Sequence, residues 1–356
     1  MSTGTFDQWQ QVFTMIHLIN KEGGAQNETA SQLQGQLETT IQTSLNDPGY
    51  QALIGSSWTL AWGPCVYQDN NSGVVDNAMF VAQNTATNTF VIAIAGTSLH
   101  SSFDKITEDA SVNPIMAWPY DQTMPSGAAF PADVCIAKGT SIGVDTLQGM
   151  QDSKGRSLEA FLQSVQSNSA TLVFTGHSLG GALAPTLACA LITQGALDLS
   201  QWGPVYVYPT AGPTPGNGAF VTLFQTLFPQ TTVGAQPWQV WNSLIWNSLD
   251  IVPHAWSSTT MSQILGLYEP TVFPGLGTIT LVQDAEKRAS GQGYQQLPSN
   301  GPLTGTIVLP KDIPNPILDP STDPFIVEAY YQHVNAYLSL LGVQALESVT
   351  VTRAAA

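Results

Sequence analysis

The chain has 356 residues, with 9 Lys+Arg against 25 Asp+Glu and a formal net charge of −16 at pH 7. Nucleic-acid binding and a polybasic membrane anchor both need clustered cations, and the sequence has no basic run, so both are excluded. Hydrophobic residues make up 43% of the chain, which excludes disorder by composition.

Membrane insertion, export and disulfide bonding have no clear signal in the sequence. The longest apolar run, near 179–192, covers only about four helical turns, too few to cross a bilayer. The first residues lack both a basic and an apolar stretch, so no signal peptide is expected there. Cys65, Cys135 and Cys189 show no metal-binding spacing, and buried thiols are favoured over one disulfide plus a free thiol.

The first fifty residues predict helices within about 5–46. Apolar side chains recur at helical spacing from Phe6 to Ile19, and a second helix is expected from Glu28 to about Leu45. The sequence Asn-Asp-Pro-Gly at 46–49 is a turn signal, so the helical region is expected to end there.

From residue 58 onward, predicted strands alternate with predicted helices. The stretch 89–95 is apolar throughout, as in a strand buried on both faces, and it forms a predicted hairpin with 78–83. Other strands are expected at 58–68, 133–138, 171–176, 205–208 and 239–241, and helices at 142–150, 157–167, 179–193, 219–228 and 325–341. This alternation indicates an α/β protein with a mostly parallel, mixed central sheet and helices on both faces.

Two irregular stretches interrupt the alternation, at 98–131 and at about 257–324. Neither reads as a linker between two separate units. The chain 1–356 is therefore interpreted as a single domain that carries 257–324 as an insertion.

The motif Gly-x-Ser-x-Gly occurs around Ser178 and around Ser141. In a nucleophile elbow this motif forms a strained turn between a buried strand and a helix, and it holds the serine hydroxyl above the sheet. Ser178 lies between an apolar strand and a long helix, whereas the segment before Ser141 is short and ends in Lys138. Ser178 is therefore the favoured nucleophile, and an ordinary helix N-cap is the alternative.

A serine nucleophile needs a histidine to accept its proton and a carboxylate to orient that histidine. In α/β-hydrolases the acid and then the histidine follow the serine along the chain. Of the five histidines, two precede Ser178 and one is its neighbour in the elbow, which leaves His254 and His333. His333 is favoured, because His254 would make one short loop supply both groups. Asp250, after a predicted strand, is the favoured acid over three rivals: Asp198, Asp319 and Asp323.

Five segments of the chain, in the same order, resemble the class 3, fungal-type lipases of the α/β-hydrolase fold. They are Gly96-Thr97 after a strand, the elbow GHSLGG, the stretch GPTPGNGAF at 212–220, Asp250 in DIVP and His333 in QHVNAYL. The resemblance covers about 58–341. It implies ester hydrolysis by Ser178, Asp250 and His333, with an oxyanion hole formed by the backbone N–H groups of Thr97 and Leu179.

The resemblance also carries implications beyond the catalytic residues. No metal or organic cofactor is expected, and a secreted enzyme is favoured. Ala95 and Thr214-Pro215 stand where family members usually have arginine, and the segment after Thr97 lacks the family's usual tryptophan. These departures concern local ion pairs at the sheet edge and leave the triad assignment intact.

A lid over about 98–125 is a further implication of the resemblance, and such a lid would open at a lipid surface. Phe103, Ile106 and Trp118 are its apolar candidates, with an ordinary surface crossover as the alternative. Trp246 and Trp256, on either side of Asp250, are candidates to line the acyl pocket, although loop aromatics often only pack.

The sequence therefore predicts a serine ester hydrolase, first of all a triacylglycerol lipase acting on neutral acyl-ester lipid in transient contact with a lipid–water interface. A carboxylesterase or feruloyl-type esterase on soluble esters, and a non-catalytic lipase-like interaction module, are the alternatives. A phospholipase is disfavoured, because a protein of charge −16 is repelled by anionic bilayers. Nucleic acid is excluded as a partner, and no transmembrane segment is expected.

Overall fold

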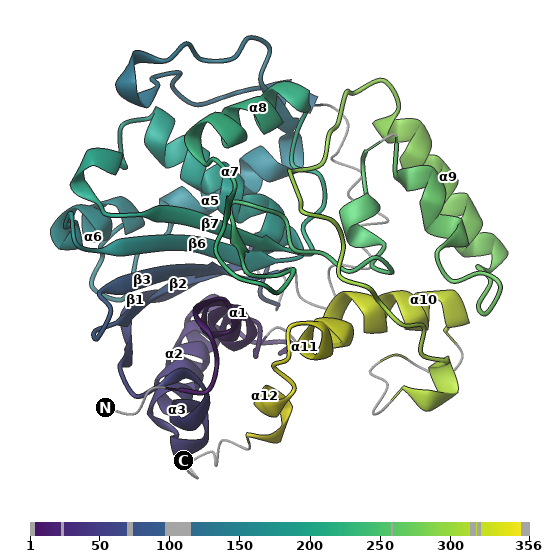
Figure 1. Cartoon of the computed structure of the whole chain (residues 1–356), viewed down its shortest axis with the longest axis horizontal. Coiled ribbons are helices and arrows are strands. Elements are labelled where there is room, and N and C mark those ends of the chain that lie inside the picture. Colours follow the sequence, from purple (N-terminus) through teal and green to yellow (C-terminus); the bar gives the residue numbers. More distant parts are fainter. Residues whose placement is uncertain are drawn as a thin grey trace.

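A mixed five-stranded sheet forms the centre of the computed structural model (Figure 1). Its order is β1 (Trp58–Tyr67), β2 (Asn77–Asn84), β3 (Thr89–Ile94), β6 (Thr171–His177) and β7 (Val205–Thr210). β2 runs antiparallel to both neighbours, while β3, β6 and β7 run parallel, so four of the five strands share one direction. The structure describes residues 4–22, 25–69, 74–96, 115–257, 259–313, 318 and 322–349.

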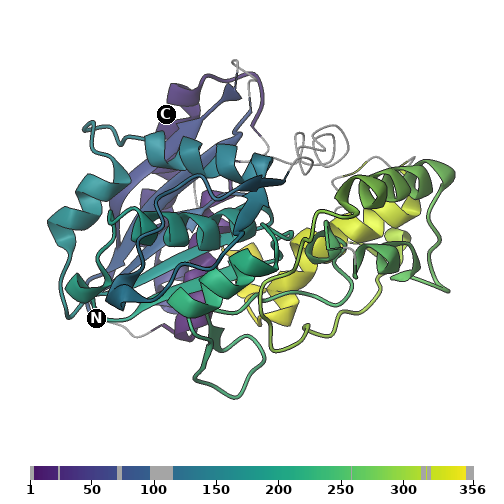
Figure 2. The same ribbon diagram turned by 90° about the horizontal axis from the view of Figure 1, so that it is seen from above.

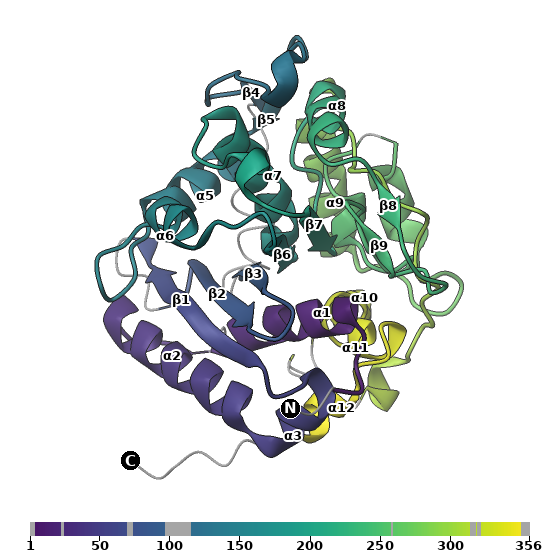
Figure 3. The ribbon, with the colours of Figure 1, turned by 60° about the vertical axis from the view of Figure 1, so that its left-hand side comes forward.

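Helices cover both faces of the sheet, which confirms the predicted fold class (Figures 1 and 3). One face carries α5 (Lys138–Gly149), α6 (Leu158–Val165), α7 (Leu179–Thr193) and α8 (Gly218–Leu227). The other carries α1 (Gln8–Ile19) and α2 (Ala30–Asn46). β3 shows why its sequence is apolar throughout: Ile92 belongs to the core under α7, and its neighbours Val91 and Ala93 belong to the core under α1. Successive side chains of a strand point to opposite faces, so both must be apolar here.

The N-terminal helices begin at side-chain caps, and the turn predicted after them is in fact a helix start. Asp7 and Thr29 form capping boxes at the first residues of α1 and α2. Asp47 accepts hydrogen bonds from the N–H groups of Gly49 and Tyr50, and a third helix, α3 (Pro48–Ile54), follows. Proline is favoured at the first position of a helix, which is why the sequence Asn-Asp-Pro-Gly indicated only a turn.

Two predicted strands lie outside the central sheet. β5 (Cys135–Ala137) pairs with β4 (Ile115–Ala117), and β9 (Val240–Trp241) pairs with β8 (Thr231–Thr232). The interpretation of 239–241 as a strand is therefore right, but that strand belongs to a separate small ladder. Beyond β7, isolated bridges continue the edge of the sheet, from Thr210 to Ile245 and from Asn247 to Leu303.

The expected insertion at 257–324 contains one helix that its sequence does not predict, α9 (Leu276–Ala289). α9 lies beside α10 (Pro324–Tyr330) at the end of the molecule away from the sheet (Figure 2). A separate apolar cluster holds this region together, with Tyr268 and Phe325 fully buried in it. The inner face of α9 is made of small or β-branched residues, namely Thr278, Val282, Ala285 and Ala289. Its sequence therefore lacks the broad apolar stripe of an ordinary surface helix.

The last long helix is confirmed in extent and is divided into three parts. α10 continues into a π-helical segment, Tyr331–Asn335, and then into α11 (Ala336–Leu340); the short α12 (Ala345–Ser348) follows. π-helical turns are rare and are frequent at functional sites. The segment carries His333.

The structure also bears on the predictions for the cysteines and for the candidate lid. Cys65, Cys135 and Cys189 are free. Trp118 lies in the core under α7 and α8, 6% exposed, with its ring centroid 6.0 Å from that of Phe220, which corrects its expected place on a lid. Phe103, Ile106 and Thr97 fall outside the described residues, as does most of 98–125. Within the described part of the chain, no helix has the length and apolar character needed to cross a membrane.

Candidate active site

Ser178 lies in a strained turn between β6 and α7. Its backbone has φ 60° and ψ −126°, a conformation that costs a non-glycine residue free energy and persists only where the surroundings enforce it. Its N–H donates to the carbonyl of Thr210 on the next strand over a distance of 3.1 Å. The turn that the sequence predicts for a nucleophile elbow is therefore present at Ser178.

Two glycines make this turn possible, because they let the backbones of β3, of the elbow and of the start of α7 approach closely. A Cβ on Gly176 would overlap the carbonyl group of Gly180, and a Cβ on Gly180 would overlap the carbonyl oxygen of Ile94 at the end of β3. No side chain, not even that of alanine, fits at either position without moving the backbone. Ser141, the rival, is buried within α5 and is not at a strand-to-helix turn.

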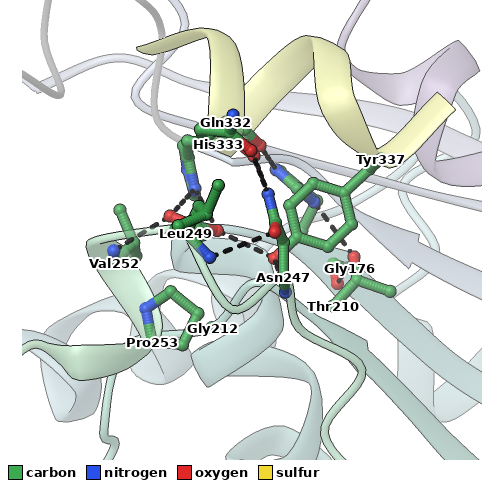
Figure 4. A network of polar contacts seen from close by, with 12 residues as sticks. Gly176, Thr210, Gly212, Asn247, Leu249, Val252, Pro253, Gln332, His333 and Tyr337 are labelled. Carbon is green, nitrogen blue, oxygen red and sulfur yellow. Dashed lines mark hydrogen bonds and ion pairs between the residues drawn. The ribbon is translucent and has the colours of Figure 1, made fainter. Parts of the chain in front are cut away.

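Asp250 and His333 form a close pair; Figure 4 shows His333 with its neighbours Gln332 and Tyr337. Nδ1 of His333 lies 3.0 Å from Oδ1 and 2.9 Å from Oδ2 of Asp250. The carboxylate is fully buried, while the His333 side chain is 15% exposed. An acceptor on Nδ1 places the proton of a neutral imidazole there, so Nε2 is left with a lone pair. Asp250 thus fixes the tautomer in which Nε2 of His333 is free of a proton.

Two further groups orient the Asp250 carboxylate. The hydroxyl of Tyr337 donates to Oδ2 at 2.8 Å, and the N–H of Val252 donates to Oδ1 at 2.9 Å. The Tyr337 oxygen in turn accepts the N–H of Asn247 at 3.0 Å. Burial and the neighbouring Asp250 charge raise the pKa of Tyr337 well above its ordinary value, so it stays a hydrogen-bond donor.

The π-helical segment presents two successive carbonyl groups to side chains from elsewhere in the chain. Nδ2 of Asn247 donates to the carbonyl of Gln332 at 3.0 Å, and Nε2 of His177 lies 2.7 Å from the carbonyl of His333. Such partners satisfy backbone acceptors that the change of helical register leaves available. The segment that carries His333 is thereby attached to the Asp250 turn on one side and to the elbow on the other (Figure 4).

A buried polar chain extends this support away from the site. Oε1 of Gln332 accepts from Asn247 at 2.7 Å, and Nε2 of Gln332 donates to Glu328 at 2.7 Å and to the carbonyl of Thr306 at 2.7 Å. Glu328 also accepts the N–H of Val308 at 3.0 Å, and burial raises its carboxyl pKa. These contacts attach α10 to residues 306–308 of the expected insertion.

His177, which precedes the elbow serine, contacts His333 directly. The two ring centroids are 4.8 Å apart, and that of Tyr337 lies 4.9 Å from His177 with its ring edge-on. Nδ1 of His177 lies 3.1 Å from the hydroxyl of Thr210. Burial, and then the neighbouring His333, lower the pKa of His177 well below its ordinary value. A neutral His177 with its proton on Nε2 satisfies the His333 carbonyl.

The other candidates from the sequence lie nearby in different surroundings. His254 is buried, packs edge-on against Trp246 with centroids 5.3 Å apart, and has its pKa lowered by burial. Trp246 donates to the hydroxyl of Ser299 at 3.1 Å, and Trp256 packs into the cluster under α9. Asp250 therefore pairs with His333 in preference to His254. Of the rival acids, Asp198 and Asp323 cap short helices, and Asp319 is not among the described residues.

Of the segment that leads to the predicted oxyanion donor Thr97, the structure describes residues up to Gly96. A Cβ on Gly96 would lie 3.2 Å from that of Ser178, so the end of β3 meets the elbow. The N–H of Gly96 donates to the side chain of Asn20, at the end of α1, over 3.0 Å. Leu179 is the first residue of α7, where backbone N–H groups have no partner within the helix and attract negative charge.

From the sequence we propose Ser178, Asp250 and His333, but none of the side chains that surround Asp250. Asn247, Gln332, Glu328 and Tyr337 are polar side chains that belong to the buried network around Asp250. Their spacing could have indicated them. Glu328 and Gln332 are four residues apart on the predicted last helix, and so are His333 and Tyr337, so each pair lies on one face of that helix. Among the described residues, no group of His, Cys, Asp and Glu has the arrangement of a metal site.

Comparison with known proteins agrees with this geometry. The fold and the strand-elbow-helix arrangement are those of the α/β-hydrolases. The model of the class 3 lipase family matches residues 88–259. M37 lipase superimposes with a TM-score of 0.74 at 25% identity, over 95% of this chain and 93% of that one. The central part of the chain thus resembles the class 3 lipases, and the two matches support an ester-hydrolysing enzyme.

Other solved structures match the chain with lower scores. The lipase of Rhizopus microsporus var. chinensis has a TM-score of 0.39 at 16% identity, over 71% of this chain and 70% of that one. A mutant form of MDLA from Penicillium cyclopium has a TM-score of 0.47 at 14% identity, over 97% and 100%. No curated protein matches the sequence.

Proposed function

We propose that the chain is a triacylglycerol lipase that hydrolyses neutral acyl esters through Ser178, His333 and Asp250 by way of an acyl-enzyme. The observation that carries the proposal is the pair of Asp250 and His333, joined at 2.9 Å and attached to the elbow of Ser178 through His177. His177 at the end of β6, Asp250 in the turn after Asn247 and His333 in the π-helical segment are linked by these contacts, although they are far apart in the sequence.

In the first half of the reaction, Ser178 attacks the ester carbonyl carbon while Nε2 of His333 accepts its proton. Asp250, held by Tyr337 and Val252, stabilises the imidazolium that forms. The N–H of Leu179, at the start of α7, donates to the oxyanion together with the N–H of Thr97. Donors fixed in advance in this way contribute about 3–4 kcal/mol of barrier reduction each in comparable sites.

In the second half, His333 returns the proton to the departing alcohol, which leaves the acyl group bonded to Ser178. Water then attacks the acyl-enzyme as His333 accepts its proton. The bond to Ser178 breaks, His333 returns the proton to the Ser178 oxygen, and the fatty acid leaves. Both halves use the same proton-accepting nitrogen and the same oxyanion donors.

The arginines favour a neutral substrate. Arg156 pairs with Asp152 at 2.8 Å, and Arg288 lies in the last turn of α9; Arg353 is beyond the described residues. Neither described arginine is part of the hydrogen-bonded network around Asp250 and His333. A bidentate clamp for a phosphate or carboxylate group, the usual function of arginine at such sites, is therefore not formed by either of them.

A chain-length series tests the proposal. Wild type and Ser178→Ala are compared on triacylglycerols from tributyrin to triolein and on matched p-nitrophenyl esters. We expect activity on the long-chain triacylglycerols, and a loss of at least about 10³-fold in Ser178→Ala with the fold retained by circular dichroism. Activity confined to dissolved short-chain or feruloyl esters would instead identify an esterase. Residual activity of Ser178→Ala within tenfold of wild type would contradict the assignment of the nucleophile.

A further inference from the structure

An apolar patch lies on the part of the molecule that the insertion forms. Among the described residues, six large hydrophobic side chains are exposed, and three of them fall within 273–281. Phe273 is 60% exposed, Leu276 is 85% exposed and Leu281 is 44% exposed. We call these three residues the α9 patch. Scattered single hydrophobics are normal on protein surfaces, whereas a concentration of them points to an interaction site. Phe273 and Leu276 lie three positions apart where α9 begins and form the main part of the patch, because Leu281, five positions after Leu276, faces another side of the helix.

Charge is absent from the same stretch. From Pro270 to Gln283 the chain has no Asp, Glu, Lys or Arg, although its formal net charge is −16. The nearest cations in the sequence after it are Lys287 and Arg288, in the last turn of α9. The exposed apolar residues therefore lie in an uncharged stretch of an acidic protein, with the Asp323 carboxylate beside Gly275 and Thr278, and this surrounding selects against anionic partners.

The patch is held firmly against the helix that leads to the site. Asp323, at the N-cap of α10, accepts the N–H of Gly275 at 2.8 Å and the hydroxyl of Thr278 at 2.6 Å. On the inner face of α9, Val282 and Ala289 pack into the cluster around Phe325. Figure 1 shows α9 beside α10, the helix that continues into the segment of His333.

We propose that the α9 patch docks the enzyme on the surface of an uncharged ester-lipid phase. Phe273 and Leu276 would enter the lipid while α10 holds the site at a fixed position beside that surface. The inference rests on the proposed function, because it takes the substrate to be a neutral lipid phase. It goes beyond the proposed function in assigning surface binding to the insertion, which lies outside the predicted lid. Burial of apolar side chains in lipid, without a contribution from charge, is the expected source of affinity.

A binding experiment that is independent of catalysis tests the proposal. Variants are made in the Ser178→Ala background, and the fraction bound to trioctanoin droplets is measured by flotation. The test variant carries Phe273→Ser and Leu276→Ser, and Leu276→Ser alone is the milder form. The matched control is Ile142→Ser, because Ile142 is 54% exposed on α5, on the sheet side of the molecule. We expect at least tenfold weaker droplet binding for the double variant, about threefold weaker for Leu276→Ser, and no change for the control.

The same surface variants with Ser178 intact separate docking from chemistry. Hydrolysis of dissolved p-nitrophenyl butyrate should match wild type, while hydrolysis of trioctanoin droplets should fall in step with binding. Equal droplet binding by the double variant and the Ile142→Ser control would overturn the proposal. So would a wild-type dimer, in sedimentation, that the double variant dissociates, since a second copy would then occupy the patch. Tighter binding to anionic vesicles than to droplets would contradict the uncharged partner.

Discussion

The elbow of Ser178 and the segment of His333 are positioned in different ways. At the elbow, backbone meets backbone: Gly176 and Gly180 allow contacts that no side chain would permit, and strain is confined to one residue. Around His333, side chains do the positioning, because Asn247 and His177 bind the carbonyl groups of a π-helical turn. The position of Ser178, the proposed nucleophile, thus depends on neighbours without side chains, and that of His333, the proposed base, depends on polar groups distant in the sequence.

This difference decides which substitutions the elbow of Ser178 and the segment of His333 tolerate. An enlarged residue disrupts the elbow, whereas a lost hydrogen bond disrupts the base. The side-chain network is also buried and polar, so each broken bond leaves an unsatisfied group that costs about 1–3 kcal/mol. The first two predictions below test the side chains that position His333, and the third concerns the helix that packs behind the elbow.

Asp250→Asn should have the largest effect. The amide preserves the shape of the carboxylate but cannot fix the Nδ1–H tautomer of His333 or stabilise the imidazolium. We expect kcat to fall roughly 10⁴-fold, the size typical of this change in serine hydrolases, with nearly unchanged KM. Steady-state kinetics on p-nitrophenyl butyrate measure it. Asp198→Asn, which alters an exposed cap on the far side of α7, is the control and should retain full activity. A loss below tenfold at Asp250 would exclude it as the orienting acid.

His177→Phe should have an intermediate effect. Phenylalanine keeps a ring against His333 and Tyr337 but cannot donate to the His333 carbonyl. We expect kcat to fall about tenfold, equivalent to about 1.4 kcal/mol, while KM stays constant. His177→Gln places an amide donor near the position of Nε2 and should recover most of the loss. If the Phe and Gln variants have equal kcat, His177 serves packing alone, and the proposed positioning of His333 through its carbonyl is wrong.

The smallest predicted effect concerns stability in acid and the helix that packs behind the elbow. α1 lies against β3 and β6 and carries His17, whose pKa is lowered to about 4 by burial and by Lys21. Between pH 4 and 6.5 the unfolded chain binds more protons there than the folded one, so the free energy of unfolding falls as the pH falls. The slope for one such histidine reaches about 1.4 kcal/mol per pH unit.

Urea unfolding of wild type and His17→Gln at pH 7, 5.5 and 4.5 measures that slope. The variant should show a shallower loss of stability below pH 6.5 than wild type. Identical pH dependence in the two proteins would show that His17 titrates normally in the folded state. Lys311→Gln, which changes one charge in the insertion, should leave the slope unchanged.

The same contrast explains what the sequence could predict. Elements built on local patterns are predicted closely: the helix expected at 179–193 is α7 residue for residue, and the elbow motif lies where its strand and helix require. Elements that depend on distant partners are missed. The inner face of α9 consists of small residues, so its sequence lacks a clear apolar stripe. The π-helical turn at His333 depends on the side-chain donors Asn247 and His177, which only the fold brings to its carbonyl groups.

The other differences between prediction and structure concern one helix start, one strand pairing and one tryptophan. Pro48 opens α3 after Asp47, where a turn was expected, because the same residues serve both structures. Val240–Trp241 forms a strand as predicted, yet it pairs with Thr231–Thr232, and pairing partners do not follow from the pattern of one segment. Trp118 joins the core although its sequence neighbourhood is irregular.

Ser178, activated by His333, is the nucleophile that we propose. A p-nitrophenyl alkylphosphonate should inactivate the enzyme with a stoichiometry of one, and peptide mass mapping should place the adduct on Ser178. The rate of labelling should fall by at least about 10³-fold in His333→Ala and stay at the wild-type value in His254→Ala. An adduct on Ser141, or full activity after complete labelling of Ser178, would contradict the account.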